Sequence, residues 1–429
     1  MTSVNRIIIY FISVILYFKM HNGYLLTYFS YLTEVTNLEF SKEGLFFLII
    51  SSSLVLLKRL RKDSFQIIYL LLEVIFFAPL ITYLSFTNYM TSGFYISILL
   101  SLLVYNYNIG AIRVNIQGFI HERYIEVFAF ITLFVSVVFV SRFQFNLDFN
   151  AIYDVRETFA EKTPGVLRYF VSWSAYFSVP YLLLRAINYY KTPKKITLLF
   201  FLIVQLLLFS IGNNKSFLVV YLTVFFYTLF EINSGFKVDW NMLKKYTKYY
   251  VGLLGVLFSV VFIFPSYYIV ASFIFLRTVS LAPRQLDLYY KFVHVLDSDV
   301  TFLAQNFPFR YIFNYPHSDV LGKVVSQRVL GIESNANAAF LFSDGIAGFG
   351  IYLGPIISFV LFNFVLSLIF INPKNNQKIR VLLSIPLLIQ ILNTSIFVAF
   401  ITGGGLLIMV LGMTKTGVKA INSKDLLAK

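Results

Sequence analysis

Residues 44–86 read GLFFLIISSSLVLLKRLRKDSFQIIYLLLEVIFFAPLITYLSF. Two apolar runs, 44–57 and 64–86, flank the basic cluster KRLRK at 58–62. A membrane-spanning helix needs about 20 mostly apolar residues, and short basic loops stay on the cytoplasmic side of the membrane. This stretch therefore predicts two membrane helices joined by a cytoplasmic loop, and it decides the fold class.

The same alternation of apolar runs and charged connections recurs along the chain. Short basic clusters in every second connection contain most of the 35 Lys and Arg residues, and this distribution predicts that both the N and the C terminus are cytoplasmic. We predict an all-α fold, a polytopic transmembrane helical bundle of about 12 helices. The expected spans are 4–20, 44–57, 64–86, 93–111, 125–141, 167–187, 196–211, 216–232, 249–271, 346–371, 381–400 and 403–414.

The composition excludes several classes of protein. Hydrophobic residues make up 58% of the chain and charged residues only 13%, whereas soluble domains carry about 25% charged residues. There is no cysteine, which excludes disulfides, thiolate-bound metals and thiol nucleophiles, and the four histidines are scattered. We therefore expect no metal and no other cofactor. The net charge of +15 follows from the membrane topology and does not indicate nucleic-acid binding.

Five parts follow from these spans, two of them external loops. The loop at 272–345 is too long, at about 74 residues, to be a simple connector, so we expect it to be partly helical and to carry the function. The predicted parts are N-terminal helices in 1–141, an external loop in 142–166, helices in 167–271, the large external loop in 272–345, and C-terminal helices with a cytoplasmic tail in 346–429.

Two cations in shorter external segments are candidate anion ligands. Arg156 lies in the first of the two loops and Lys215 in the turn GNNKS. An arginine at a membrane surface can bind phosphate through two parallel hydrogen bonds. Alternatively, Arg156 pairs with a neighbouring carboxylate or a lipid headgroup, and Lys215 anchors its turn at the interface.

A third cationic group begins the large loop. Pro283 suits the first turn of a helix, and Arg284, Asp287 and Lys291 would then share one helix face, with Arg277 leading in from the membrane. This pattern predicts a cationic pocket at the bilayer surface. The alternative is a solvated helix face with an Arg284–Asp287 pair.

The end of the large loop carries a histidine and several polar side chains. His317 has a near-neutral pKa and can accept a proton from a hydroxyl, while Asn335 and Asn337 suit hydrogen bonds to sugar hydroxyls. A lone loop histidine can equally be ordinary polar surface, and Asp344 can be a helix N-cap. Four polar residues lie inside predicted spans and must be shielded from lipid: Glu73, Gln205, Gln390 and Asn393. They can form a proton path or, alternatively, hydrogen bonds between helices.

Four stretches together resemble the Wzy-type O-antigen and capsule repeat-unit polymerases. They are IYDVRETFAEKTPGVLRYFVSW at 152–173, GNNKSFLVVYL at 212–222, LRTVSLAPRQLDLYYKF at 276–292 and NANAAFLFSDGIAGFGIYLGP at 335–355. The resemblance covers about residues 142–360 in order and topology. Lys215 stands where that family more often has arginine.

The resemblance implies a multi-pass glycosyltransferase of the bacterial inner membrane whose active face is periplasmic or extracellular. Its substrate would be an undecaprenyl-diphosphate-linked oligosaccharide, and its partners membrane lipid, a flippase and a chain-length regulator protein. Arg156, Arg277 and Arg284, helped by Lys215, would hold the diphosphate. His317 would be the general base, with Asp287 and Asp344 as rivals, and Tyr289, Asn335 and Asn337 would orient sugars.

Four other functions remain open from the sequence. An O-antigen ligase or another lipid-linked glycosyltransferase shares the long outer loop and the diphosphate chemistry, and Glu34, Glu39 and Glu43 fit the acidic first loop of enzymes that use polyprenyl monophosphate sugars. A lipid-linked oligosaccharide flippase or a transporter would also have about 12 helices. Such proteins are expected to carry short external loops or repeated halves, which this chain lacks.

Overall fold

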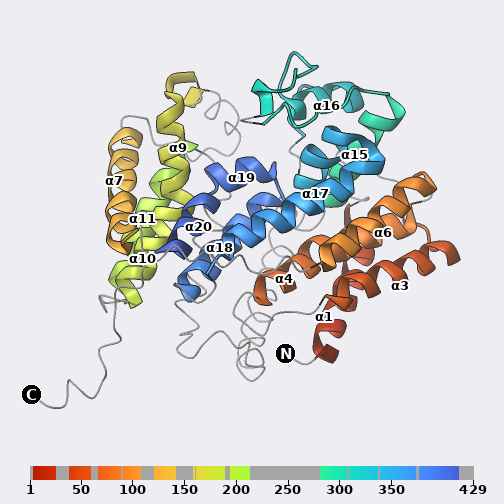
Figure 1. Ribbon diagram of the computed structural model, residues 1–429, viewed down its shortest axis with the longest axis horizontal. Coiled ribbons are helices and arrows are strands. Elements are labelled where there is room, and N and C mark those ends of the chain that lie inside the picture. The colour runs from red at the N-terminus through yellow and green to blue at the C-terminus, as the bar shows by residue number, and fades with distance from the viewer. Residues whose placement is uncertain are drawn as a thin grey trace, which may run out of the picture. The chain divides into compact units, whose positions relative to one another are not determined.

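The computed structural model is helical throughout the part of the chain that it describes (Figure 1). It forms two compact units, described separately below. Unit 1 comprises residues 1–108, 236–363 and 391–396, and unit 2 comprises 109–235, 364–390 and 397–429. The described residues are 3–25, 38–58, 66–87, 90–107, 120–141, 158–159, 161–188, 194–212, 281–306, 309–336, 339–372 and 376–414.

The N-terminal helices of unit 1 pack around α5. This helix contacts α1 and α3, and α3 also contacts α6. Ser41 begins α3 by accepting a hydrogen bond from the backbone N–H of Gly44 on its hydroxyl, at 3.0 Å. The bounds are α1 (Ser3–Met20), η1 (His21–Leu25), α3 (Lys42–Leu57), α4 (Gln66–Leu72), η2 (Glu73–Phe77), α5 (Ala78–Phe86) and α6 (Ser92–Asn106).

The described end of the large loop is helical and folds onto these helices. The helix α15 contacts α5, η8 and α16. Gly331, with φ of 67°, ends α16 in the left-handed conformation that favours glycine. The bounds are α15 (Leu281–Tyr290), η6 (Lys291–Val295), η7 (Phe309–Tyr311), α16 (Leu321–Leu330), η8 (Leu341–Ile346) and α17 (Ala347–Ile369).

Unit 2 is organised around α7, which contacts α9, η3, α10 and α11. Hydroxyl pairs Thr132–Ser178 (2.7 Å) and Ser136–Ser174 (2.8 Å) join α7 to η3, a typical means of joining apolar helices. The bounds are α7 (Glu122–Val140), α9 (Gly165–Trp173), η3 (Ser174–Ser178), α10 (Val179–Asn188), α11 (Lys194–Gly212), α18 (Gln377–Ile391), α19 (Ile396–Thr402, whose first residue belongs to unit 1) and α20 (Gly405–Met413).

Three described helical segments, Ile68–Phe86, Glu122–Val140 and Leu341–Ile369, are long and apolar enough to cross a membrane. A fourth crossing results if α19 and α20, which are bent by 59° relative to each other, form one broken span. The chain is therefore a helical membrane protein, as predicted. The number of about 12 spans, the cytoplasmic termini and the bacterial inner membrane remain predictions.

Two predicted boundaries are wrong. The span expected at 381–400 is divided, since α18 ends at Ile391 and α19 begins at Ile396. The span expected from 346 begins at Leu341, so Asp344 lies inside a helix and not at its N-cap. The two places are in contact, because the Asp344 carboxylate accepts a hydrogen bond from Ile396, where α19 begins. The spans expected at 216–232 and 249–271 lie outside the described residues.

Candidate functional site

The predicted site residues fall into two groups. Six lie in the described part of unit 1: Arg284, Asp287, Tyr289, His317, Asn335 and Asp344. Four lie outside the described residues, so their roles remain predictions: Arg156, Lys215, Arg277 and Asn337.

The helix α15 is buried along most of its length. Asp287 is only 3% exposed, and its Oδ2 lies 3.2 Å from Nζ of Lys291, one turn later. Arg284 is partly buried on the same helix. This burial argues against a fully solvated helix face. The contact with Lys291 gives the Asp287 carboxylate a cationic partner on its own helix face.

Two tyrosines of α15 are structural. The Tyr290 hydroxyl accepts a hydrogen bond from the backbone N–H of Thr91 at 3.0 Å, which ties α15 to the connection between α5 and α6. The Tyr289 hydroxyl donates to the carbonyl of Ala336 at 3.4 Å, and its ring is fully buried. Burial raises the pKa of Tyr289. Tyr289 therefore supports the 332–336 segment and has no exposed ring on which a sugar could stack.

Asn335 is exposed beside the start of α16. A Cβ added to Gly322 would clash with its Oδ1, and Ala336 N–H donates to the Gly322 carbonyl at 3.0 Å. Glycine at 322 therefore lets the 335–336 backbone approach α16. Of the sugar-binding candidates that the structure describes, Asn335 is the exposed one.

His317 is half-buried in an aromatic and cationic cluster. Its ring contacts Phe292 and Tyr315 edge-on, with centroids 5.6 Å and 5.4 Å away. Arg328 lies over Phe292, with Cζ 6.0 Å from the ring centroid, and donates to Ser298 Oγ at 3.3 Å. Burial first, and the Arg328 charge second, lower the pKa of His317. The imidazole is therefore neutral at pH 7 and can accept a proton.

Asp344 is completely buried and both of its oxygens accept hydrogen bonds. Oδ1 accepts from Asn306 Nδ2 and from Ser395 Oγ, each at 2.7 Å, and Oδ2 accepts from the backbone N–H of Ile396 at 2.6 Å. A carboxylate at the start of a helix is also stabilised by the helix dipole. Asp344 thus joins three distant segments, and its burial separates it from any external substrate.

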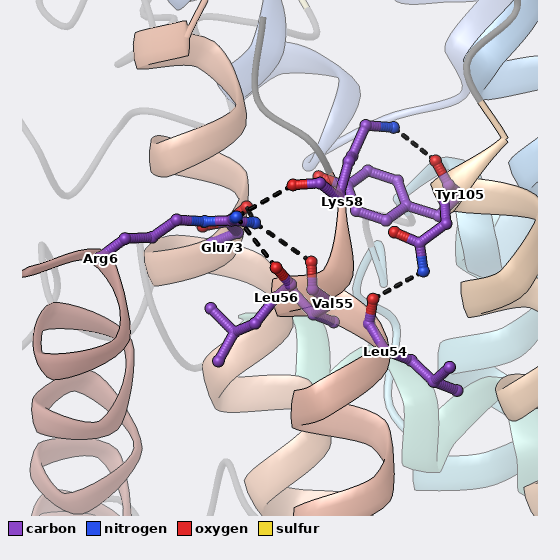
Figure 2. A network of polar contacts seen from close by, with 8 residues as sticks. Arg6, Leu54, Val55, Leu56, Lys58, Glu73 and Tyr105 are labelled. Atoms are coloured by element: carbon purple, nitrogen blue, oxygen red, sulfur yellow. Dashed lines mark hydrogen bonds and ion pairs between the residues drawn. The ribbon is translucent and has the colours of Figure 1, made fainter. Parts of the chain in front are cut away.

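A second buried network lies at the end of unit 1 where α3 and α6 terminate (Figure 2). Arg6 forms a bidentate ion pair with Glu73, with Nε to Oε2 at 2.8 Å and Nη2 to Oε1 at 2.5 Å. Its remaining donors bind the carbonyls of Val55, Leu56 and Lys58 at 2.9–3.2 Å. Arg6 therefore binds carbonyls at the end of α3, where a helix leaves its last carbonyls short of intrahelical partners.

Lys58 and Asn106 extend this network to α6. The Lys58 ammonium donates to the Tyr105 carbonyl and lies 3.8 Å from the Tyr105 ring centroid. Asn106 Nδ2 donates to Leu54 O at 2.6 Å. The sequence predicts that Glu73 needs shielding, and this is confirmed, since Glu73 is 1% exposed. Its partner Arg6, 67 residues away, was not predicted.

Among the described residues, no group of three or more His, Asp or Glu side chains is placed to hold a metal ion. The fold is that of a helical membrane protein, and the described part of its long loop at 272–345 is folded. Comparisons with family models, curated proteins and solved structures find no match for this chain.

Proposed function

We propose that this chain is a polymerase that joins undecaprenyl-diphosphate-linked oligosaccharide repeat units on the outer face of the bacterial inner membrane. The observation that best supports this proposal is the neutral His317 beside Arg328, on a loop segment that α15 anchors to the helices of unit 1. A proton acceptor and fixed cations are the groups that glycosyl transfer from a diphosphate requires.

In the proposed reaction, an acceptor hydroxyl of the next lipid-linked unit attacks the anomeric carbon of the growing glycan. The new C–O bond forms as the bond between that carbon and the diphosphate breaks. The hydroxyl proton passes to His317, and undecaprenyl diphosphate leaves with the bonding electron pair. Preorganised cations stabilise the negative charge that develops on this leaving group.

The cations assigned to the diphosphate are Arg284 together with Arg156, Arg277 and Lys215, the last three from the sequence alone. The choice of base favours His317 over both aspartates. Asp287 is paired with Lys291, and Asp344 is buried with both oxygens hydrogen-bonded. Asn335 is the sugar ligand that best fits this arrangement, because its side chain is exposed beside α16.

The proposal is tested with purified protein in proteoliposomes and a synthetic undecaprenyl-diphosphate-linked oligosaccharide. We expect a ladder of lipid-linked products in the parent protein and in Lys323→Ala, which removes an exposed cation of α16. We expect no ladder in His317→Ala and a strongly slowed ladder in Arg284→Ala. Transfer of single units to a different acceptor would instead indicate a ligase, and substrate movement without new bonds would indicate a flippase.

A further inference from the structure

A short aromatic segment near the first turns of α17 has an unusually apolar surface. It is the one-turn helix η7 with the two residues that follow it, Phe309–Phe313. Tyr311 is 76% exposed and Ile312 69% exposed. Contiguous apolar surface of this kind marks a site of protein or membrane contact.

The neighbouring residues connect this segment to a membrane span. The backbone N–H groups of Thr301 and Phe302 donate to the carbonyls of Ala347 and Gly348 at 2.9 Å and 3.0 Å. The Phe302 ring contacts Phe349 and Phe313, with centroids 6.3 Å and 6.0 Å away. A continuous row of rings therefore runs from the first turns of α17 to the aromatic segment.

The same part of α17 exposes apolar side chains. Tyr352 and Leu353 lie one turn beyond Phe349 and are both exposed, within the span Leu341–Ile369. Exposed apolar surface of this kind on a helix that can cross a membrane is suited to contact with lipid. The aromatic segment thus adjoins exposed apolar surface of a helix that is long and apolar enough to cross a membrane, and this favours the bilayer as its partner.

Charge supports the same partner. Arg310 is the single Lys, Arg, Asp or Glu residue between Asp299 and Asp319, and it is exposed. Its guanidinium carbon lies 5.8 Å from the Tyr311 ring centroid. Aromatic rings gather at the headgroup level of membranes, and guanidinium groups bind phosphate with two hydrogen bonds.

From these contacts we infer that Phe309–Phe313 is an interfacial anchor, which inserts its apolar side chains among the lipids of the outer leaflet and binds lipid phosphate through Arg310. This anchor would hold the loop that carries His317 at the membrane surface. The inference is independent of the reaction that the chain catalyses.

The absence of native cysteine makes a direct test simple. Ile312→Cys and Glu333→Cys, both at exposed positions, are labelled with a nitroxide and reconstituted in vesicles of phosphatidylcholine and phosphatidylglycerol. We expect the label at 312 to collide more often with oxygen than with a water-soluble nickel chelate, and the label at 333 to show the reverse. Equal behaviour at both positions, or protection of 312 from both reagents by a second copy or another protein, would overturn the inference.

A second measurement tests the role of Arg310. A fluorophore attached to the thiol of the Ile312→Cys variant is quenched by spin-labelled phosphatidylglycerol or phosphatidylcholine. We expect stronger quenching by the anionic lipid, and a ratio close to one after Arg310→Gln. A ratio that is unchanged by this substitution would exclude a preference of Arg310 for anionic headgroups. Since Ile312 and Arg310 are exposed, neither substitution removes a buried contact, and size-exclusion chromatography checks that both variants fold.

Discussion

The carboxylate of Asp344 accepts a hydrogen bond from the backbone N–H of Ile396, 52 residues further along the chain. This contact lies where one predicted span divides into α18 and α19. A break between two helices leaves backbone groups without intrahelical partners, and each needs another acceptor or donor. Asp344 supplies that acceptor for the first residue of α19.

Asp344→Asn is expected to destabilise the protein by about 1–3 kcal/mol. The substitution keeps the shape but replaces one acceptor oxygen by an NH2 donor. At least one of the three donors around residue 344 then faces another donor, whichever way the amide is turned. Unfolding by SDS in mixed micelles measures the change, and Asp319→Asn, at an exposed position, is the matched control. Equal stability of the two variants would show that this contact contributes little.

Most helix positions were predictable because each depends on a local run of apolar residues. The span expected at 125–141 is observed as α7, Glu122–Val140, and the span expected at 64–86 begins at Gln66. The break at 392–395 was not predicted, and the carboxylate that binds the start of the next helix is distant in sequence. Local hydropathy averages over such a break and predicts one continuous helix.

For the described candidate residues, the sequence predicted which residues share a helix better than it predicted their burial and tertiary contacts. The grouping of Arg284, Asp287 and Lys291 on one helix follows from spacing, but the burial of Asp287 depends on how α15 packs against α5 and η8. Arg328 was missed because it lies in an ordinary amphipathic helix. Only the folded chain brings it to Phe292 and His317.

Glu73→Gln is expected to cost about 3–5 kcal/mol, because it leaves the Arg6 charge buried without its counter-ion. The double variant Arg6→Met with Glu73→Met should cost less than the sum of the two single Met variants, since it removes both charges. Part of the cost should persist, because the α3 carbonyls lose their donor. SDS unfolding of the four proteins in this cycle measures the coupling, with exposed Arg123→Ala as control. Additive costs would contradict a coupled pair.

Arg284→Ala is expected to lower the rate of polymerisation by roughly 10²–10³-fold, the loss typical of removing one group that stabilises developing charge. Arg284→Lys should recover only part of the rate, because an ammonium cannot form two parallel hydrogen bonds to phosphate. Initial rates of ladder formation in proteoliposomes measure both effects. A normal rate in Arg284→Ala would remove this residue from the proposed diphosphate site.

The acid limb of the activity profile should report the ionisation of His317. Burial and the Arg328 charge hold the pKa of His317 below its usual value of 6.5, so the base stays neutral and active at neutral pH and loses activity only below that value. Arg328→Gln removes a positive charge that lowers the pKa of His317. The pKa should therefore rise, and the acid limb should move to higher pH. Asp299→Asn removes a negative neighbour that raises the pKa, and should move the limb to lower pH. Measuring kcat/KM against pH in the three proteins tests the signs together. A limb that moves in neither variant would mean that another group accepts the proton. Opposite shifts would support His317, because a change in folding alone would not move the two profiles in opposite directions.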